Sequence, residues 1–424
     1  MTNFRRFEDR RRNAIYIIVG ASLLAGLLTG QSLFFTITYA FIGLVFLSLF
    51  WAWTSIRWLK IERHTFARRA QVGQTLHERV TITNTGSLPK LWLEIYDQST
   101  LPGHRASFVA SNLGSRKSLY WEVNTLCLQR GEFFLGPMEV VTGDPFGLFT
   151  IRRRISATTG VLVYPAMIDI REFPLPVGLL SGGDAIRQRT HHITTNAAGV
   201  RDYAPGDSLN RIHWGSTAKR SRLMVKEFEL DPLADLWIVV DLEKTVQAGE
   251  AVVTHADLLE RYRTGRDTIP PTTEEYIVSI GASLSRFFLS KGRSVGLLAH
   301  GQRREIVQAD RGPRQITKIL EALAVIEAEG AVSFDQVITL ESDQFSHGTT
   351  VILISASTRD TWVQSAATLN YRGLQAIGIL VDPQSFGGRP GIERTASYLQ
   401  DANIPTYLIR RSDDISVALA QQNS

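Results

Sequence analysis

The chain has 424 residues, of which 44% are hydrophobic and 21% charged, and its formal net charge is +5 at pH 7. This length is too great for one ordinary domain, and the composition excludes an intrinsically disordered protein. The single cysteine, Cys127, excludes an intramolecular disulfide and suits a reducing compartment. Arginine clusters beside apolar segments explain the mild basicity. Since no nucleic-acid-binding module is recognisable, we expect no nucleic-acid partner.

Two uncharged apolar runs, 14–30 and 31–56, lie near the start of the chain. A membrane-spanning helix needs about 20 mostly apolar residues, a length that the second run exceeds and the first nearly reaches. Only the short turn Gly30-Gln31-Ser32 joins the two apolar stretches, so the two helices must be antiparallel. We predict a transmembrane hairpin within residues 1–58. A cleaved signal peptide is the competing interpretation, but a second apolar run follows the first at once.

Basic residues flank this hairpin on both sides. Because positively charged residues are retained preferentially on the cytoplasmic side, both ends of the hairpin and both termini of the chain are expected in the cytoplasm. We therefore predict a multi-pass protein of the cytoplasmic (inner) membrane, with the lipid bilayer as one partner. The flanking residues are Arg5, Arg6, Arg10, Arg11 and Arg12 before the first helix, and Arg57, Lys60, Arg63, Arg68 and Arg69 after the second.

Residues 59–165 change to short alternating runs separated by turn residues, the pattern of half-buried strands. Roughly six to eight strands over about 100 residues are typical of a small β-sandwich, and we predict an immunoglobulin-like domain. The segment closes with the sequence Asp-Pro-Phe-Gly-Leu-Phe. Pro145 and Gly147 favour a rigid corner, in which Phe146 and Phe149 would be anchored against the domain.

Residues 166–232 form a linker that ends in a polar motif, in which turn residues, charged groups and aromatic residues follow one another closely. Asp207 would cap a helical turn that places Arg211 and Trp214 on one face. An arginine fork also suits a neighbouring carboxylate. The candidate binding or structural residues are Arg201, Tyr203, Asp207, Arg211, His213 and Trp214.

Three interpretations of this polar motif are open. In the first, it is the site of a hydrolase in which Asp207 orients His213 as a general base, although no nucleophile elbow or metal-ligand spacing accompanies the pair. In the second, its basic and aromatic residues bind an anion or an acidic partner. In the third, it fixes a loop against the neighbouring domain. We assign no catalytic residue.

The polar motif and the earlier Asp-Pro-Phe-Gly-Leu-Phe sequence together resemble the bacterial domain-of-unknown-function family 58 (DUF58). The chain matches the pattern GxRxYxPGDxxRxIHWxxxAK between Gly199 and Lys219, except that the second arginine, Arg211, stands one position later than in the pattern. The resemblance implies a bacterial inner-membrane protein with a C-terminal domain similar to von Willebrand factor A domains. It also implies neighbouring genes for MoxR-type AAA+ ATPases and transglutaminase-like membrane proteins, which are therefore the expected partners. It brings no established catalytic residues.

Residues 233–424 alternate apolar runs with amphipathic helical stretches. This alternation is typical of a parallel sheet covered by helices on both faces, a doubly wound α/β fold. In such sheets ligands bind at the carboxyl ends of strands, which directs attention to Asp241 and Glu243. The long insertion at 250–273 is a candidate partner-contact loop, or else an ordinary solvated loop.

The resemblance to von Willebrand A domains implies a Mg²⁺ site built on Asp-x-Ser-x-Ser, because hard cations prefer oxygen ligands. Asp241 and Thr245 occupy its first and last positions. Glu243 replaces the middle serine, Lys244 adds a competing positive charge, and Ser355 ends a later apolar run where an aspartate is expected. We therefore expect no cofactor, with Mg²⁺ bound by Asp241, Glu243 and Thr245 as the alternative.

The predicted function is a membrane-anchored, non-enzymatic scaffold or adaptor that presents its cytoplasmic domains to protein partners. The expected partner is a MoxR-type AAA+ ATPase, and the expected process is cell-envelope maintenance. Two alternatives stay open: a hydrolase that uses Asp207 and His213, and a Mg²⁺-dependent binding protein that uses Asp241.

Overall fold

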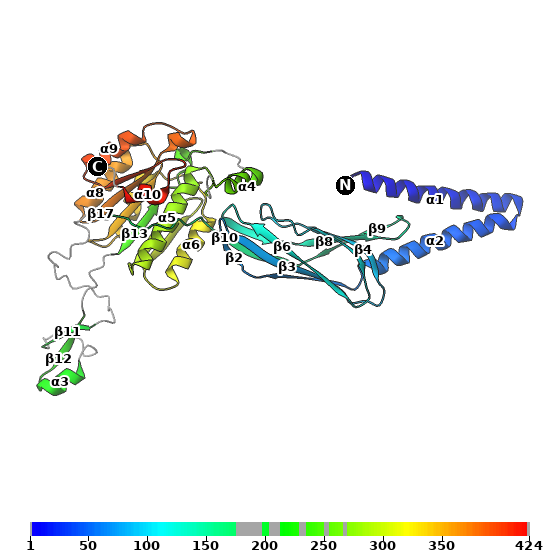
Figure 1. Cartoon of the computed structure of the whole chain (residues 1–424), viewed down its shortest axis with the longest axis horizontal. Coiled ribbons are helices and arrows are strands. Elements are labelled where there is room, and N and C mark those ends of the chain that lie inside the picture. Colours follow the sequence, from blue (N-terminus) through cyan, green and yellow to red (C-terminus); the bar gives the residue numbers. More distant parts are fainter. Residues whose placement is uncertain are drawn as a thin grey trace. The chain divides into compact units, whose positions relative to one another are not determined.

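The computed structural model describes residues 2–174, 197–202, 213–228, 235–249, 254–265 and 269–421. The chain divides into two compact units. The first comprises Met1–Met167, Ala251–Pro270 and Leu323–Val325, and the second comprises Ile168–Glu250, Pro271–Ala322 and Ile326–Ser424. The N-terminal helices and the strands that follow them thus fall in one unit, together with most of the insertion that interrupts the α/β region. Figure 1 shows the helices and strands with their labels.

Two long helices begin the chain: α1 (Thr2–Thr29) and α2 (Ser32–Ile56). Their apolar stretches, Arg10–Thr29 and Ser32–Ile56, are long enough to cross a membrane, and 11% of the most apolar part of each is buried. Gly30 adopts φ +69°, and its N–H donates to the carbonyl of Gly26 (2.9 Å). A left-handed glycine of this kind ends a helix, and here it turns the chain back into α2.

A polar pair and a glycine bring the two helices together. The hydroxyls of Ser22 and Thr38 lie 2.8 Å apart, and both residues are buried. A Cβ on Gly26 would be 3.2 Å from the ring of Phe35, so the absence of a side chain there permits close packing. Small residues and hydroxyl pairs are the contacts that hold helices together in an apolar environment.

Ten strands follow in the first unit and form three sheets, in the orders β1-β3-β6, β2-β10-β7 and β5-β4-β8-β9. β2 and β10 pair in parallel, and the other strand pairs are antiparallel. The bounds are β1 (Leu59–Thr65), β2 (Arg69–Gln71), β3 (Thr75–Asn84), β4 (Lys90–Asp97), β5 (Phe108–Leu113), β6 (Ser118–Leu126), β7 (Gly131–Leu135), β8 (Met138–Gly143), β9 (Thr150–Ile155) and β10 (Thr159–Tyr164).

Two of these sheets share one hydrophobic core. In β3 every second residue from Leu76 to Ile82 is buried, as the two-residue period of a strand predicts. Leu93 and Ile95 of β4 and Val140 of β8 belong to the same core as Ile82. The core therefore joins the β1-β3-β6 sheet to the β5-β4-β8-β9 sheet. Immunoglobulin-like topology stays a prediction.

The corner between β8 and β9 is organised by a carboxylate. The Asp144 oxygens accept hydrogen bonds from the N–H groups of Phe146, Leu148 and Phe149 at 2.7 to 2.9 Å, and Gly147 takes φ +69°. Leu148 is 3% exposed, whereas Phe146 is 47% exposed. The predicted anchoring through Phe146 is therefore wrong. Asp144 and Leu148 hold the corner instead.

The insertion after the first α/β strand contains helix α4 (His255–Arg263), which belongs to the first unit. Thr254 caps this helix and forms a reciprocal capping box with Asp257. The hydroxyl of Tyr262 donates to the carbonyl of Gly73 (3.2 Å). The sequence predicts only a loop here, because the helix is short and has few apolar residues to give it a recognisable period.

A six-stranded sheet lies at the centre of the second unit, in the order β15-β14-β13-β16-β17-β18. Neighbouring strands are parallel except for β14 and β15. The strands are β13 (Leu236–Val240), β14 (Val295–His300), β15 (Arg304–Asp310), β16 (Thr350–Ser355), β17 (Gln375–Val381) and β18 (Thr406–Ile409). The helices are α5 (Thr273–Ser290), α6 (Gln315–Val325), α7 (Phe334–Glu341), α8 (Thr361–Tyr371), α9 (Ile392–Asp401) and α10 (Ile415–Ala420).

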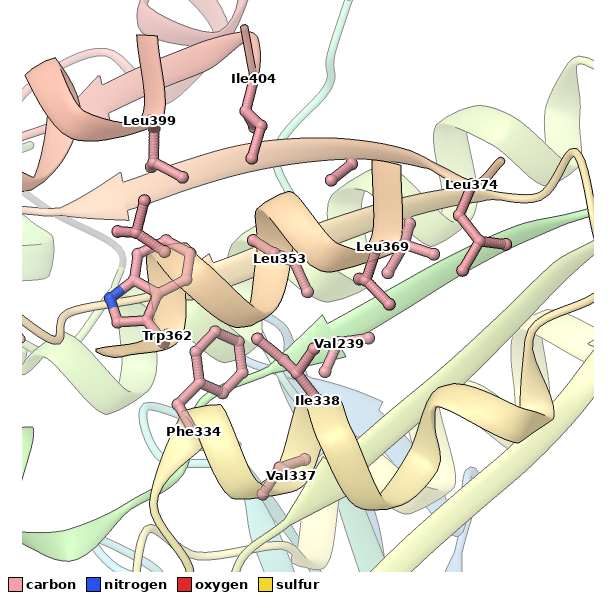
Figure 2. Packing of buried hydrophobic residues seen from close by; sticks show 14 of the residues in the cluster. Val239, Phe334, Val337, Ile338, Leu353, Trp362, Leu369, Leu374, Leu399 and Ile404 are labelled. Atoms are coloured by element: carbon pink, nitrogen blue, oxygen red, sulfur yellow. The ribbon is translucent and has the colours of Figure 1, made fainter. Parts of the chain in front are cut away.

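Helices cover both faces of this sheet. On one face, Val239 of β13 shares a core with Phe334 of α7 and Trp362 of α8 (Figure 2). On the other face, a Cβ on Gly281 of α5 would lie 3.7 Å from the side chain of Ile238. Successive residues of β13 therefore point into opposite layers, and all five of its residues are buried. Burial on both faces explains why the strands are continuous apolar runs in the sequence.

Candidate functional site

The polar motif is described only in part. Two strands, β11 (Ala197–Asp202) and β12 (Met224–Phe228), pair in antiparallel fashion, and the short helix α3 (Trp214–Arg220) lies between them in the chain. Of the six predicted residues, Tyr203, Asp207 and Arg211 lie outside the described residues. Arg201 is in β11, and His213 and Trp214 are at the start of α3.

His213 caps helix α3. Its Nδ1 accepts a hydrogen bond from the N–H of Ser216 (3.1 Å), and the Ser216 hydroxyl lies 2.8 Å from the same nitrogen. The N–H of His213 donates to the carbonyl of Met224 (2.8 Å), and the adjacent Trp214 is 68% exposed. These contacts give His213 a local structural role. The contact with Asp207 that a general base would need lies outside the described residues.

The carboxyl edge of the six-stranded sheet brings together the other predicted site residues. The chain runs from β13 outward to β14 and β15, then returns to β16 on the opposite side of β13. The ends of β13 and β16 therefore meet at a topological switch point, the place where open α/β sheets bind ligands. Asp241 follows β13, and its N–H donates to the carbonyl of Ile354 in β16 (2.9 Å).

Asp241 joins the two strand ends through its side chain. It is 1% exposed. The hydroxyl of Ser355 donates to its Oδ2 (2.5 Å), and the N–H of Glu243 donates to its Oδ1 (3.1 Å). Burial raises the pKa of the Asp241 carboxyl to about 7, against the opposing effect of these two hydrogen bonds. Asp241 is thus a buried carboxyl that links the ends of β13 and β16, and burial disfavours its ionised form.

Glu243 contacts an arginine from the loop that follows β16. Arg359 NH1 donates to both Glu243 carboxylate oxygens (2.8 and 2.9 Å), and its NH2 donates to Thr245 Oγ1 (2.9 Å). The Thr245 hydroxyl donates in turn to Glu243. The N–H of Arg359 donates to Ser357 Oγ (3.3 Å), and the N–H of Ser357 donates to Ser355 Oγ (2.8 Å). One hydrogen-bonded network therefore spans both strand ends.

The predicted Mg²⁺ ligands do not fit a bound ion. Mg²⁺ requires oxygen ligands in near-octahedral geometry. Both oxygens of Glu243 and the hydroxyl of Thr245 are bonded to Arg359, whose charge would repel an ion, and both oxygens of Asp241 accept hydrogen bonds. Within the described parts of the chain, no three His, Cys, Asp or Glu side chains are grouped as metal ligands.

The structure brings Asp241, Glu243 and Thr245 together, as their spacing suggests, and adds two residues that were not predicted from the sequence, Ser357 and Arg359. A chemical signal could have found the arginine. A buried strand that is followed by two acidic residues needs a nearby cation, and Arg359 is the first basic residue after β16.

A second charged cluster lies inside the β-rich region. Arg63 NH2 lies 2.5 Å from Asp97 Oδ1, and Arg63 Nε lies 3.6 Å from Glu78. His104 Nε2 is 3.1 Å from Glu78 and 3.3 Å from Asp97. All four side chains are 2% exposed or less. Arg63 was predicted to flank the membrane helices, and this burial corrects that assignment, because its guanidinium pairs with buried carboxylates inside the β-rich region.

Comparison with known proteins relates the chain to a family without an assigned activity. The family described as "Protein of unknown function DUF58" matches residues 199–384, a span that begins at the first residue of the polar motif. The uncharacterized protein YeaD of Bacillus subtilis is 25% identical over 305 residues, which cover 69% of each chain.

Similarity to solved structures is weak. The CARDB domain of the PF1109 protein from Pyrococcus furiosus is 16% identical, with a TM-score of 0.18 over 25% of this chain and 86% of that chain. Proximal thread matrix protein 1 from the mussel byssus is 10% identical, with a TM-score of 0.30 over 44% of this chain and 46% of that chain. The sequence matches thus support a DUF58 relationship over residues 199–384 and a distant relationship to YeaD.

Proposed function

We propose that this protein is a membrane-anchored scaffold whose α/β domain binds a protein partner at the carboxyl edge of its sheet. The observation that carries this proposal is the network around Arg359, which holds the guanidinium by three side-chain hydrogen bonds while the side chain stays 42% exposed. A group that is already ordered loses little conformational entropy when a partner binds. The position at the switch point adds support, because ligands of open α/β sheets bind there.

The anchor in this proposal is a transmembrane hairpin formed by α1 and α2, with both of its ends in the cytoplasm of a bacterial cell. The mostly exposed apolar helices and their basic flanks support this orientation. α2 ends at Ile56 and β1 begins at Leu59, so the β-rich region would follow the membrane directly. The ammonium of Lys90 donates to the carbonyl of Thr54 at the end of α2, which favours a fixed junction over a flexible one.

The partner in this proposal is a MoxR-type AAA+ ATPase, with a transglutaminase-like membrane protein as a further component in cell-envelope maintenance. The support is the DUF58 match together with the family layout that the motifs imply. We assign the β-rich region an immunoglobulin-like spacer role and the α/β domain a von Willebrand A-like binding role. Both assignments belong to the proposal.

In-cell photo-crosslinking tests the proposed surface. A photoreactive residue replaces Lys244, in the exposed 3-10 turn after β13, or Arg389, in an exposed loop between β17 and α9, and replaces Ser346 as the control. Ser346 is exposed but precedes β16 at the amino edge of the same sheet. We expect an ATPase to be captured from the first two positions and not from the third. Equal capture from all three positions, or no capture from any in folded membrane-bound protein, would contradict the proposal.

A further inference from the structure

The carboxyl edge holds the donor set of a hard-cation site: two carboxylates and the hydroxyls of Thr245, Ser355 and Ser357. A guanidinium lies among them. We propose that Arg359 is the resident cation of this site, taking the place of a divalent metal ion, so that the edge binds acidic side chains of a protein partner without any metal. The partner part of this inference rests on the proposed function, whereas the exchange of arginine for metal does not.

The hydrogen-bonding pattern supports the replacement of a metal ion by Arg359 and argues against a chance surface ion pair. A typical surface pair joins two exposed side chains, as Arg372 and Asp343 do, with 48% and 88% of the side chains exposed. Glu243, by contrast, is 6% exposed and receives two hydrogen bonds from Arg359, so only one member of this pair is exposed. A buried carboxylate needs a permanent counter-charge, and Arg359 supplies one.

Lys244 does not fill this role, although it is adjacent to Glu243 in the sequence. Its ammonium lies 2.6 Å from Glu329, and both side chains are at least 50% exposed. Glu243 and Lys244 therefore belong to separate ion pairs. Arg359 is the basic side chain that contacts the network of Glu243 and Thr245 among the described residues.

The same arrangement leaves a binding function for the arginine. Its NH1 and NH2 groups point to Glu243 and Thr245, and no described residue accepts a hydrogen bond from Nε. A guanidinium has five N–H donors in a planar fork that matches a carboxylate. An aspartate or glutamate side chain of the partner would therefore bind the exposed side of Arg359, where a metal-dependent site would offer an open coordination position.

The experiment is thermal unfolding of the full-length protein in detergent, in EDTA and then in excess Mg²⁺ or Mn²⁺. The wild type is expected to unfold at the same temperature in all three solutions. Arg359→Ala should be less stable in EDTA and should regain several degrees with either metal, because removal of the guanidinium opens the oxygen ligands. Glu243→Gln combined with Arg359→Ala should abolish the metal effect. The matched control is Arg372→Ala, which removes an exposed arginine and should show no metal effect.

Two results would overturn the proposal. One is stabilisation of the wild type by metal that is lost in Glu243→Gln, because an ion would then enter beside the arginine. The other is the absence of any metal effect in Arg359→Ala. Should that variant fail to fold in EDTA, it is prepared in excess Mn²⁺. Recovery of folded protein there supports the proposal, and failure in both solutions contradicts it.

The role of the partner is tested separately. Photo-crosslinking from the Arg389 position is repeated on permeabilised cells with and without EDTA. Capture that survives EDTA but is lost in Arg359→Ala supports a metal-free acidic contact, whereas capture that needs divalent metal contradicts it. The unfolding experiment requires no partner, so a failure of the scaffold proposal and a failure of the arginine exchange give different results.

Discussion

Among single residues, Arg63, Glu78, Asp97 and His104 show how charge is accommodated inside the β-rich region. Burial alone would lower the pKa of His104, but its contacts with Asp97 and Glu78 raise that pKa above 6.5. Burial would raise the pKa of Asp97, yet its contacts with His104, Ser99 and Arg63 lower it to about 2. The cluster therefore favours a protonated His104 beside ionised carboxylates, in which two positive and two negative charges balance.

These shifts predict a loss of stability in weakly alkaline solution. Because the folded state holds the His104 proton more tightly than the unfolded state does, the resulting stability is complete below about pH 6.5 and is lost as the pH rises through the folded pKa. The Asp97 contribution is present above its unfolded pKa of 3.8 and is lost as the pH falls toward 2. We expect the unfolding temperature of the wild type to fall above about pH 6.5.

The control for this prediction is His104→Gln, which retains a hydrogen-bonding side chain but cannot titrate. The variant should be less stable at low pH and should lose the part of the alkaline slope that belongs to His104. Asp241, whose pKa is raised to about 7 by burial, reduces the stability of both proteins as the pH rises toward 7, so its effect cancels in the comparison. Identical slopes in the two proteins above neutral pH would rule out His104 as the titrating group.

Asp144 gives a second prediction for a single residue. Its carboxylate accepts three backbone N–H bonds and is 3% exposed. Asp144→Ala would leave those donors without an acceptor, and hydrogen bonds to a charged group contribute about 1.5–3 kcal/mol each. Since such losses are not additive, we expect a decrease of roughly 3 kcal/mol in the free energy of unfolding. Asp144→Asn keeps one carbonyl oxygen as an acceptor, so its free energy of unfolding should fall by about half as much. Equal stability of both variants and the wild type would contradict this role of Asp144.

Among the secondary-structure elements, helix α4 depends on one glycine of the β-rich region. Gly103 has φ +75°, and a Cβ there would lie 2.0 Å from Nε2 of His255. Gly103→Ala should therefore displace the start of α4 and speed amide hydrogen exchange over 255–263. Gly292→Ala is the matched control, since Gly292 has φ +74° and no atom within 4 Å of its added Cβ. It should incur only backbone strain of about 1–2 kcal/mol and leave α4 unchanged. Amide hydrogen exchange over 255–263 that is as slow in Gly103→Ala as in the wild type would show that the contact with His255 does not hold the helix.

The elements that the sequence predicts well are those whose burial leaves a period in the chain. β13 is a continuous apolar run because both of its faces are covered, and β3 alternates because only one is. β15 leaves no such period, because it is an antiparallel edge strand that is at most half-buried and contains charged residues such as Arg304 and Glu305. α4 was missed because its stability comes from a cap and from contacts made elsewhere in the first unit rather than from its own apolar face.

The residues of the candidate site also differ in whether the sequence predicts them. Asp241, Glu243 and Thr245 could be predicted because they follow a buried strand within five residues of one another. Arg359 could not be predicted from spacing, since it is 116 residues beyond Glu243 in the sequence, and only the pairing of β13 with β16 brings the two together. Long-range pairing of this kind leaves no local pattern, so the sequence can indicate that a cation is needed near the acidic residues, whereas the fold shows that Arg359 is that cation.

At the scale of the whole molecule, the proposal depends on the membrane topology, and the single cysteine makes that topology measurable. Cys127 is fully buried, and burial raises the pKa of its thiol to about 11. Because the thiolate is the reactive form, the wild type should remain unlabelled by a maleimide and serve as the blank. Gln31→Cys places an exposed thiol at the turn between α1 and α2, while Ser111→Cys and Ser346→Cys place one in each compact unit.

A membrane-impermeant maleimide should then label Gln31→Cys in intact spheroplasts, and label the other two variants only after the membrane is permeabilised. This outcome follows because the positive flanks keep both ends of the hairpin inside, which leaves the uncharged turn as the part that crosses. Labelling of Ser111→Cys or Ser346→Cys in intact spheroplasts would place the folded units outside the cytoplasm, where a cytoplasmic ATPase could not reach Arg359. Protection of all three thiols, with the protein recovered in the soluble fraction, would instead show that α1 and α2 pack as a hairpin without crossing the bilayer.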